Sequence, residues 1–121
     1  MHELIKLTAT QAVAKLKVGE ISPLDLIDAS EARILETDDA INALPTRCFE
    51  RARTHAKKIM SEGVEKDTRS LHGLPIAIKD LTAVEGVRHT LGSPIFADQI
   101  AAHSDVMVKR LEARGAVVVA K

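Results

Sequence analysis

A continuous apolar run near the C-terminal end constrains the fold of this 121-residue chain more than any other feature. Residues 116–120 have the sequence AVVVA, and an unbroken β-branched run of this kind is typical of a strand buried on both faces. Such a strand belongs to a parallel sheet that helices cover on each side. A helical pattern precedes it, with Ser104 and Asp105 as the expected cap and Gly115 as the stop. The predicted fold class is therefore α/β.

A second strand is predicted upstream, in the sequence GLPIAIKD of residues 73–80. Gly73 and Pro75 are turn formers, three apolar residues follow, and the run ends abruptly at Lys79 and Asp80. A strand, a helix and a second strand imply two parallel strands with a right-handed connection. Lys79 would then lie at the carboxyl edge of the sheet, where active-site groups of open α/β sheets tend to lie.

Two interpretations of Lys79 remain open from the residues alone. In the first, the ammonium group at the end of the strand simply reaches water. In the second, Lys79 is desolvated and acts as a general base. Holding a lysine uncharged near neutral pH costs about 4 kcal/mol, so only a well-built site can do this.

The N-terminal half is predicted to be mainly helical. The expected elements are a helix over residues 9–18 capped by Thr8 and Gln11, a helix from Ser22-Pro23 to about Glu36, a short edge strand at 41–44, a helix over 46–60, and a surface loop at 61–70. The basic residues of the fourth element are expected on a solvated face, because acidic residues balance them over the whole chain.

A long irregular segment, residues 81–103, follows the first predicted strand, and we expect it to lie over the strand end as a pocket wall. Ser93 falls within it and has two interpretations. It lacks the Gly-x-Ser-x-Gly setting of a nucleophile elbow, so a turn serine is favoured and contact with substrate is the alternative. Asp80 has two interpretations as well: it orients Lys79 or, as we favour, it caps a turn.

Composition excludes several classes of function. Zero formal net charge and the absence of Trp and Tyr argue against a nucleic-acid binder. No run approaches the length of a membrane span and no leader pattern begins the chain, so we expect a cytoplasmic protein without membrane contact. Cys48 is the single cysteine, which excludes an internal disulfide. His72, His89 and His103 lack the spacing of a helical zinc pair, and we predict neither a metal nor a cofactor.

The block GLPIAIKD resembles the G-x-P-x-x-x-K-D block of the amidase signature family. Residues 86–94 are similar to the glycine-rich segment that follows it in that family, and residues 104–121 are similar to its next helix and strand. The resemblance implies an α/β/α fold that hydrolyses a carboxylic amide C–N bond with a Ser-Ser-Lys triad. It also implies that Lys79 is the catalytic lysine.

The two serines of the triad lie, in that family, in a Gly/Ser-rich block downstream of the strand that ends this chain. The six serines present here all lack a Gly-Gly-Ser context: Ser22, Ser30, Ser61, Ser70, Ser93 and Ser104. We therefore expect residues 1–121 to be the N-terminal portion of an amidase domain, inactive alone. Residues 1–60 would be mainly helical, 61–70 a surface loop, and 71–121 a strand-loop-helix-strand unit.

Two alternatives to an amidase segment stay open. One is a fragment of the amidase-like subunit of tRNA-dependent amidotransferase, which would need partner subunits. The other is a non-catalytic remnant that serves as a binding or interaction module. The expected partner of the full enzyme is a small-molecule amide substrate, and the isolated chain is expected to self-associate through an open sheet edge.

Overall fold

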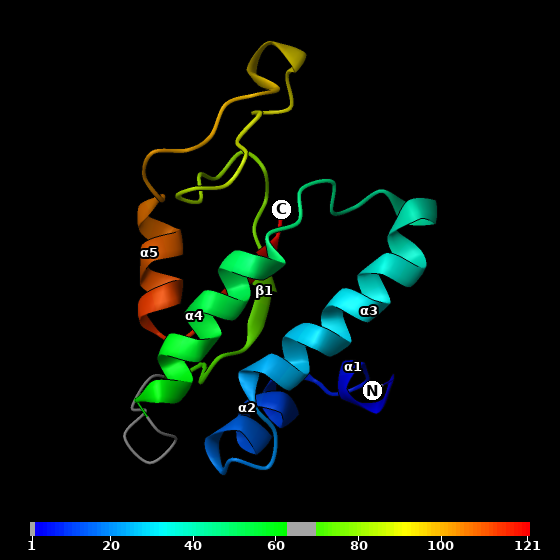
Figure 1. Ribbon diagram of the computed structural model, residues 1–121, viewed down its shortest axis with the longest axis vertical. Helices are drawn as coiled ribbons and strands as arrows, with labels where there is room; N and C mark the ends of the chain where they lie inside the picture. Colours follow the sequence, from blue (N-terminus) through cyan, green and yellow to red (C-terminus); the bar gives the residue numbers. More distant parts are fainter. Residues whose placement is uncertain (1, 63–69) are drawn as a thin grey trace.

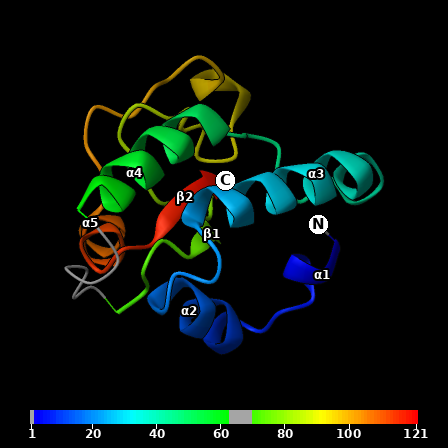
Figure 2. The same ribbon diagram turned by 60° about the horizontal axis from the view of Figure 1, so that its bottom comes forward.

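Strand β2 (Val117–Ala120) lies in the middle of the molecule, and the computed structural model describes residues 2–62 and 70–121 (Figures 1 and 2). It pairs in parallel with β1 (Pro75–Ala77), and the register shifts between Ile76 and Ala77. The predicted parallel strands joined through a helix are confirmed. The helices are α1 (His2–Ile5), α2 (Ala9–Lys17), α3 (Pro23–Ile41), α4 (Phe49–Ser61) and α5 (Val106–Ala113), with a short 3-10 helix, η2, at Pro94–Phe96.

The side chains of β2 alternate between two apolar layers. Val117 and Val119 pack in one cluster with Ile27 of α3 and residues of α4. Val118 packs in another, which includes Val108 of α5. All four residues of β2 are buried, as the unbroken apolar run predicted. The sheet is thus covered by α3 and α4 on one face and by α5 on the other, an α/β/α arrangement.

Two helix starts follow the sequence prediction closely. The Thr8 side chain accepts a hydrogen bond from the Gln11 backbone N–H, and the Gln11 side chain accepts one from the Thr8 N–H. Ser22 and Asp25 form the same reciprocal box at the start of α3, with Pro23 in its first turn. Each box satisfies two N–H groups that would otherwise lack partners at a helix start.

The C-terminal part of α3 differs from the prediction. The helix was expected to end near Glu36 and to be followed by an edge strand at 41–44, and both expectations are wrong. It continues to Ile41 because the Asp38 carboxylate accepts hydrogen bonds from the N–H groups of Ala43 and Leu44, which lie just beyond the helix. Asp38 lies in a polar stretch that is typical of a helix end, but here its side chain lies within the helix and caps the residues that follow it.

The second edge of β2 is covered by the residues before α4 rather than by a strand at 41–44. The backbones of Thr46 and Lys121 exchange two hydrogen bonds, and the Cys48 N–H donates to the Val119 carbonyl. Among the described residues, no strand pairs with the outer edge of β1. Self-association through that edge stays a prediction.

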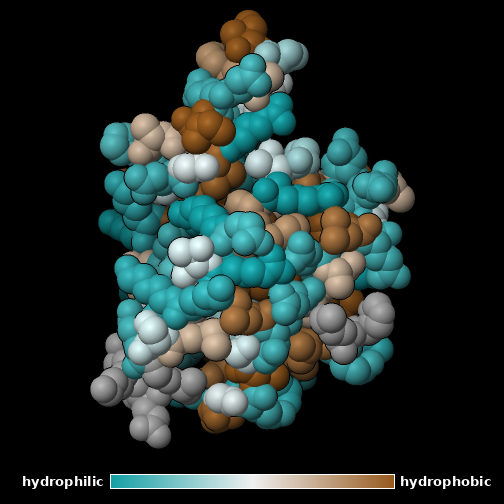
Figure 3. All heavy atoms as spheres, in the orientation of Figure 1, coloured by the Kyte–Doolittle hydropathy of each residue, from teal (hydrophilic) through white to brown (hydrophobic). Residues whose placement is uncertain are grey.

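Residues 81–103 form the predicted long irregular segment, apart from η2 (Figure 1). The segment folds back on itself through hydrogen bonds that join residues 86–89 to residues 99–101. Its far end projects from the body and carries hydrophobic surface, including Ile95, which is 86% exposed (Figure 3). The helix cap after this segment is Asp105 rather than Ser104, whose hydroxyl accepts from the Glu85 N–H instead.

Two further predictions concern the loop at residues 61–70 and the absence of a membrane span. Of the loop predicted at 61–70, residues 63–69 lie outside the described residues. Among the helices that the structure describes, none has both the length and the apolar character needed to cross a bilayer.

Gly73 provides a test of how the helical and sheet parts fit together. Its φ is +97°, and a Cβ placed there would lie 2.3 Å from Cγ of Pro23 at the start of α3. Gly86 has a similar φ of +78° but open space around it. Both Gly→Ala changes impose a left-handed backbone on alanine, whereas only Gly73→Ala adds a steric clash.

We expect Gly73→Ala to lower the free energy of unfolding by about 1–3 kcal/mol more than Gly86→Ala does. Urea denaturation followed by circular dichroism measures both. Equal losses in the two variants would show that the contact between Gly73 and Pro23 does not constrain the fold.

Candidate active site

The carboxyl ends of β1 and β2 bring two lysines to the same edge of the sheet. Ile78 continues β1 by donating its N–H to the Ala120 carbonyl, and Lys79 follows directly. On the neighbouring strand, Lys121 follows Ala120. Because the strands are parallel, both side chains start from one edge, yet their surroundings differ sharply.

Lys79 is exposed and lines a hollow of about 370 Å³, near the lower end of the size range of small-ligand sites. Within the described part of the chain, its ammonium group forms no hydrogen bond or ion pair. The wall of the hollow opposite Lys79 comes from residues 42–45, the irregular segment after α3, rather than from residues 81–103 as predicted. A small molecule can reach the amine from solvent.

Lys121 is the opposite case, since its side chain is fully buried. Its Nζ lies 3.1 Å from the Asp80 carbonyl oxygen, 3.4 Å from the Arg88 carbonyl oxygen and 3.1 Å from Nδ1 of His89. The nearest carboxylate oxygen, Oδ1 of Asp80, is 3.6 Å away. Burial lowers the pKa of Lys121, and the negative charge of Asp80 partly opposes this change.

Asp80 joins the end of β1 to the segment that follows. Its carboxylate accepts hydrogen bonds from the N–H and the hydroxyl of Thr90, at 3.2 and 2.7 Å, and from the N–H of Gly92, at 3.0 Å. Burial would raise the pKa of Asp80, but these bonds and the charge of Lys121 outweigh it and lower the pKa well below its usual range. The carboxylate caps the turn at 90–92, which agrees with the interpretation of Asp80 as a turn cap.

Ser93 does not share the hollow of Lys79. Its hydroxyl accepts from the Ile95 N–H and caps η2, while its own N–H donates to the Thr90 carbonyl. These contacts agree with the turn interpretation, and contact with substrate stays a prediction. The structure therefore keeps the two predicted site residues, Lys79 and Ser93, in different surroundings.

Other groups capable of chemistry are held in structural roles. The Cys48 thiol donates to the Val118 carbonyl at 3.5 Å, and burial raises its pKa, which disfavours the reactive thiolate. No three His, Cys, Asp or Glu side chains of the described residues are grouped so that they could hold a metal ion.

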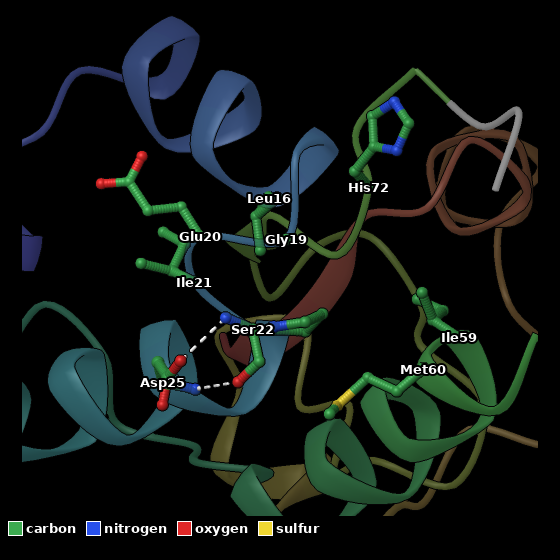
Figure 4. A pocket seen from close by; sticks show the side chains of 10 residues that line it. Leu16, Gly19, Glu20, Ile21, Ser22, Asp25, Ile59, Met60 and His72 are labelled. Carbon is green, nitrogen blue, oxygen red and sulfur yellow. Dashed lines mark hydrogen bonds between the residues drawn. The ribbon is translucent and has the colours of Figure 1, made fainter. Parts of the chain in front are cut away.

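A separate hollow lies toward the amino end of β1, between α2, α3 and α4 (Figure 4). Its apolar lining includes Leu16, Ile21 and Ile59, and Ser22 and Asp25 face it. The hydroxyl and carboxylate of these last two residues are engaged in the helix cap. This hollow has no residue in common with the hollow of Lys79 at the opposite end of the strand.

Comparisons with known proteins identify the family of this chain. Residues 25–121 match the amidase family model. The chain belongs to the amidase signature family. It is 39% identical, over 98% of its length, to a glutamyl-tRNA(Gln) amidotransferase subunit of Anaeromyxobacter dehalogenans, and 34% identical over its whole length to an amidase of Pseudomonas putida. It spans about a quarter of each of these relatives (24% and 26%).

A solved structure gives the same picture of the fold. It is described as a vestigial protein complex that reveals the evolutionary origins of an s-triazine catabolic enzyme. The TM-score is 0.87 at 34% identity, over 93% of this chain and 25% of the other. This amidase signature chain therefore has the arrangement that the same part of the fold has in a relative.

Sequence reasoning missed the buried cluster around Lys121. The signal was present, because a lysine follows an entirely apolar strand that runs parallel to the strand ending in Lys79. Parallel strands place both lysines at one edge, and of the two strands it is the one before Lys121 that the apolar run predicts to be buried on both faces. The partners of Lys121 could not be named, since they come from residues 80 and 88–89, far away in sequence.

The lowered pKa of Asp80 predicts a pH-dependent contribution to stability. A carboxyl whose pKa is depressed by folding stabilises the native state above its unfolded pKa of about 3.9, and this contribution is lost as the pH falls toward the folded pKa. We expect Asp80→Asn to lower the free energy of unfolding by about 1–3 kcal/mol at neutral pH, because one of the two acceptor oxygens that bind Thr90 and Gly92 becomes a donor and the charge opposite Lys121 is lost.

Urea denaturation at neutral pH and at a series of acidic pH values measures this difference. The gap between wild type and variant should shrink as the medium becomes more acidic than pH ~4. The exposed Asp39→Asn change on α3 serves as the control and should leave stability almost unchanged. A gap that is absent at neutral pH, or that does not depend on pH, would contradict the role given to the Asp80 carboxylate.

Proposed function

We propose that this chain is the lysine-bearing N-terminal part of an enzyme that hydrolyses a carboxylic amide C–N bond. The observation that carries the proposal is the position of Lys79, accessible at the carboxyl end of β1 within the family's G-x-P-x-x-x-K-D block and facing a hollow. Lys121, the other lysine at this edge, is fully buried and is surrounded by three protein acceptors, so its amine is not open to a substrate.

In the complete enzyme, neutral Lys79 would take a proton, through a bridging serine, from the serine that attacks the amide carbonyl. The new C–O bond and the broken C–N bond give an acyl-enzyme, and the amine or ammonia leaves with a proton from the same relay. Water then attacks the ester, transfers its proton to the relay and releases the acid. Backbone N–H groups near the serine block would stabilise the oxyanion.

The exposure of Lys79 in residues 1–121 fits a site that is completed by further chain. A general base of this kind works in a pocket from which water is excluded. In residues 1–121, the segment 42–45 and the strand end form part of the wall of such a pocket. The triad serines and the remaining wall would come from the part of the fold that the longer relatives possess. The cytoplasmic location predicted from the sequence belongs to the same proposal.

A second candidate is the subunit of a tRNA-dependent amidotransferase that releases ammonia from glutamine. The identity of 39% to the Anaeromyxobacter dehalogenans protein favours it. The same lysine and the same acyl-enzyme would serve, with glutamine as the amide. A binding or interaction module without catalysis is the third candidate, and loss of all turnover in a complete chain with intact serines would favour it.

The proposal predicts that Lys79 is required for turnover. We suggest a hybrid in which residues 1–121 replace the matching quarter of the Pseudomonas putida amidase. Lys79→Met should lower the rate of ammonia release from simple amides by roughly 10²–10⁴-fold, because the proton acceptor is lost. Lys109→Met, at an exposed position on α5, is the matched control and should keep the parent rate. Undiminished turnover by a correctly folded Lys79→Met hybrid would refute the assignment.

The isolated chain of 121 residues is predicted to release no ammonia from simple amides or from glutamine. It carries the proposed base but none of its serines lies in a Gly-Gly-Ser context. A coupled ammonia assay at high protein concentration tests this expectation. If the isolated chain releases ammonia and Lys79→Met abolishes this release, residues 1–121 contain all the residues needed for catalysis.

A further inference from the structure

The ammonium group of Lys121 connects three parts of the chain that are distant in sequence. It extends from the end of β2, contacts Asp80 at the end of β1, and contacts Arg88 and His89 in the segment between β1 and α5. Its side chain is fully buried, and His89 is 9% exposed. The contact therefore lies inside the molecule, and it involves the residue that follows Lys79.

The hydrogen-bonding capacity of Lys121 is fully used. An ammonium group has three N–H donors and no acceptor, and here it has three acceptors: the carbonyl oxygens of Asp80 and Arg88 and Nδ1 of His89. Because an ammonium group can only donate, Nδ1 of His89 is the acceptor in this contact. The Asp80 carboxylate provides the opposite charge at 3.6 Å.

Hydrogen bonds hold the backbone on both sides of Lys79, and Lys121 makes one of them. The residue after it, Asp80, is bound through its carbonyl by Lys121 and through its carboxylate by Thr90 and Gly92. The carbonyl of Lys79 itself accepts the Thr82 N–H at 2.9 Å. Before Lys79, Ile78 is held to β2 through the Ala120 carbonyl. The side chain of Lys79 thus projects from a backbone that is hydrogen-bonded on both sides, and one of these bonds comes from Lys121.

Stability alone does not account for a buried cation at this position. Removing an ammonium group from water is expensive, and apolar replacements of buried ion pairs are often neutral or stabilising. Val118 and Val119, the neighbours of Lys121 along β2, show that this strand can bury apolar side chains on either face. What a buried ammonium group has, and an apolar side chain lacks, is a set of directed hydrogen bonds to its neighbours.

We propose that Lys121 is a positioning residue for the catalytic edge of the sheet. Its ammonium group sets the backbone direction at Lys79 and holds residues 88–92 against the ends of both strands. The catalytic consequence rests on the proposed function, since it requires Lys79 to act as the base. The structural consequence does not depend on that function.

The test uses the 121-residue chain itself, with Lys121→Met as the variant and Lys109→Met as the matched exposed control. Amide hydrogen exchange by NMR compares the N–H groups of Thr82, Thr90 and Gly92 with that of Ala52 in α4. We expect exchange to accelerate about tenfold or more at the first three in Lys121→Met, with little change at Ala52 and none in the control.

A second readout follows the imidazole ¹⁵N signals of His89. In the wild type these signals should show Nδ1 as an acceptor with the proton on Nε2. In Lys121→Met the ring should no longer be restricted to this tautomer. His89→Phe, which removes one acceptor and keeps an aromatic ring, should accelerate exchange at the same amides as Lys121→Met. The His89→Phe variant keeps the proposal testable if Lys121→Met fails to fold.

Equal acceleration at Ala52 and at the strand-end amides, or loss of folding in both variants, would overturn the proposal, because Lys121 would then support the whole fold. Unchanged exchange with an unchanged His89 tautomer would overturn it as well. Neither readout needs amide turnover. An active Lys79→Met hybrid would therefore remove the proposed function without affecting the test of positioning by Lys121.

Discussion

Burial of one ammonium group at the carboxyl ends of two parallel strands is the constraint on which the rest of the candidate site depends. A cation in this position is tolerated only if acceptors replace its water and a carboxylate balances its charge. Lys121 meets both requirements with groups from Asp80, Arg88 and His89. The need for these partners ties the two strand ends and the segment between β1 and α5 into one unit.

The two lysines at this edge divide the tasks that an amide hydrolase of this kind would need. Lys121 is enclosed and saturated with acceptors, so it holds the backbone. Lys79 is exposed and has no partner within the described residues, so it is available to a substrate or to further side chains. The apolar layers behind them, centred on Val117 and Val118, give β2 a rigid setting on both faces.

Local features of the fold could be predicted from the sequence because their causes are local. The caps at Thr8 and Ser22, the buried strand β2 and the position of Lys79 all follow from residues a few positions apart. The extension of α3 could not be predicted, because the Asp38 side chain acts on residues beyond the helix end. The cluster around Lys121 depends on partners more than thirty residues away, which no periodic pattern identifies.

The most direct measurement of the role of Lys121 is a ¹H–¹⁵N correlation spectrum of the lysine ammonium groups, recorded on the ¹⁵N-labelled chain at mildly acidic pH. A buried ammonium group with three protein acceptors exchanges its protons slowly with water. We predict one such protected signal, with nuclear Overhauser contacts to the His89 ring. If every lysine ammonium group exchanges as fast as one in free solution, the strand ends are not held by Lys121 and its central role is contradicted.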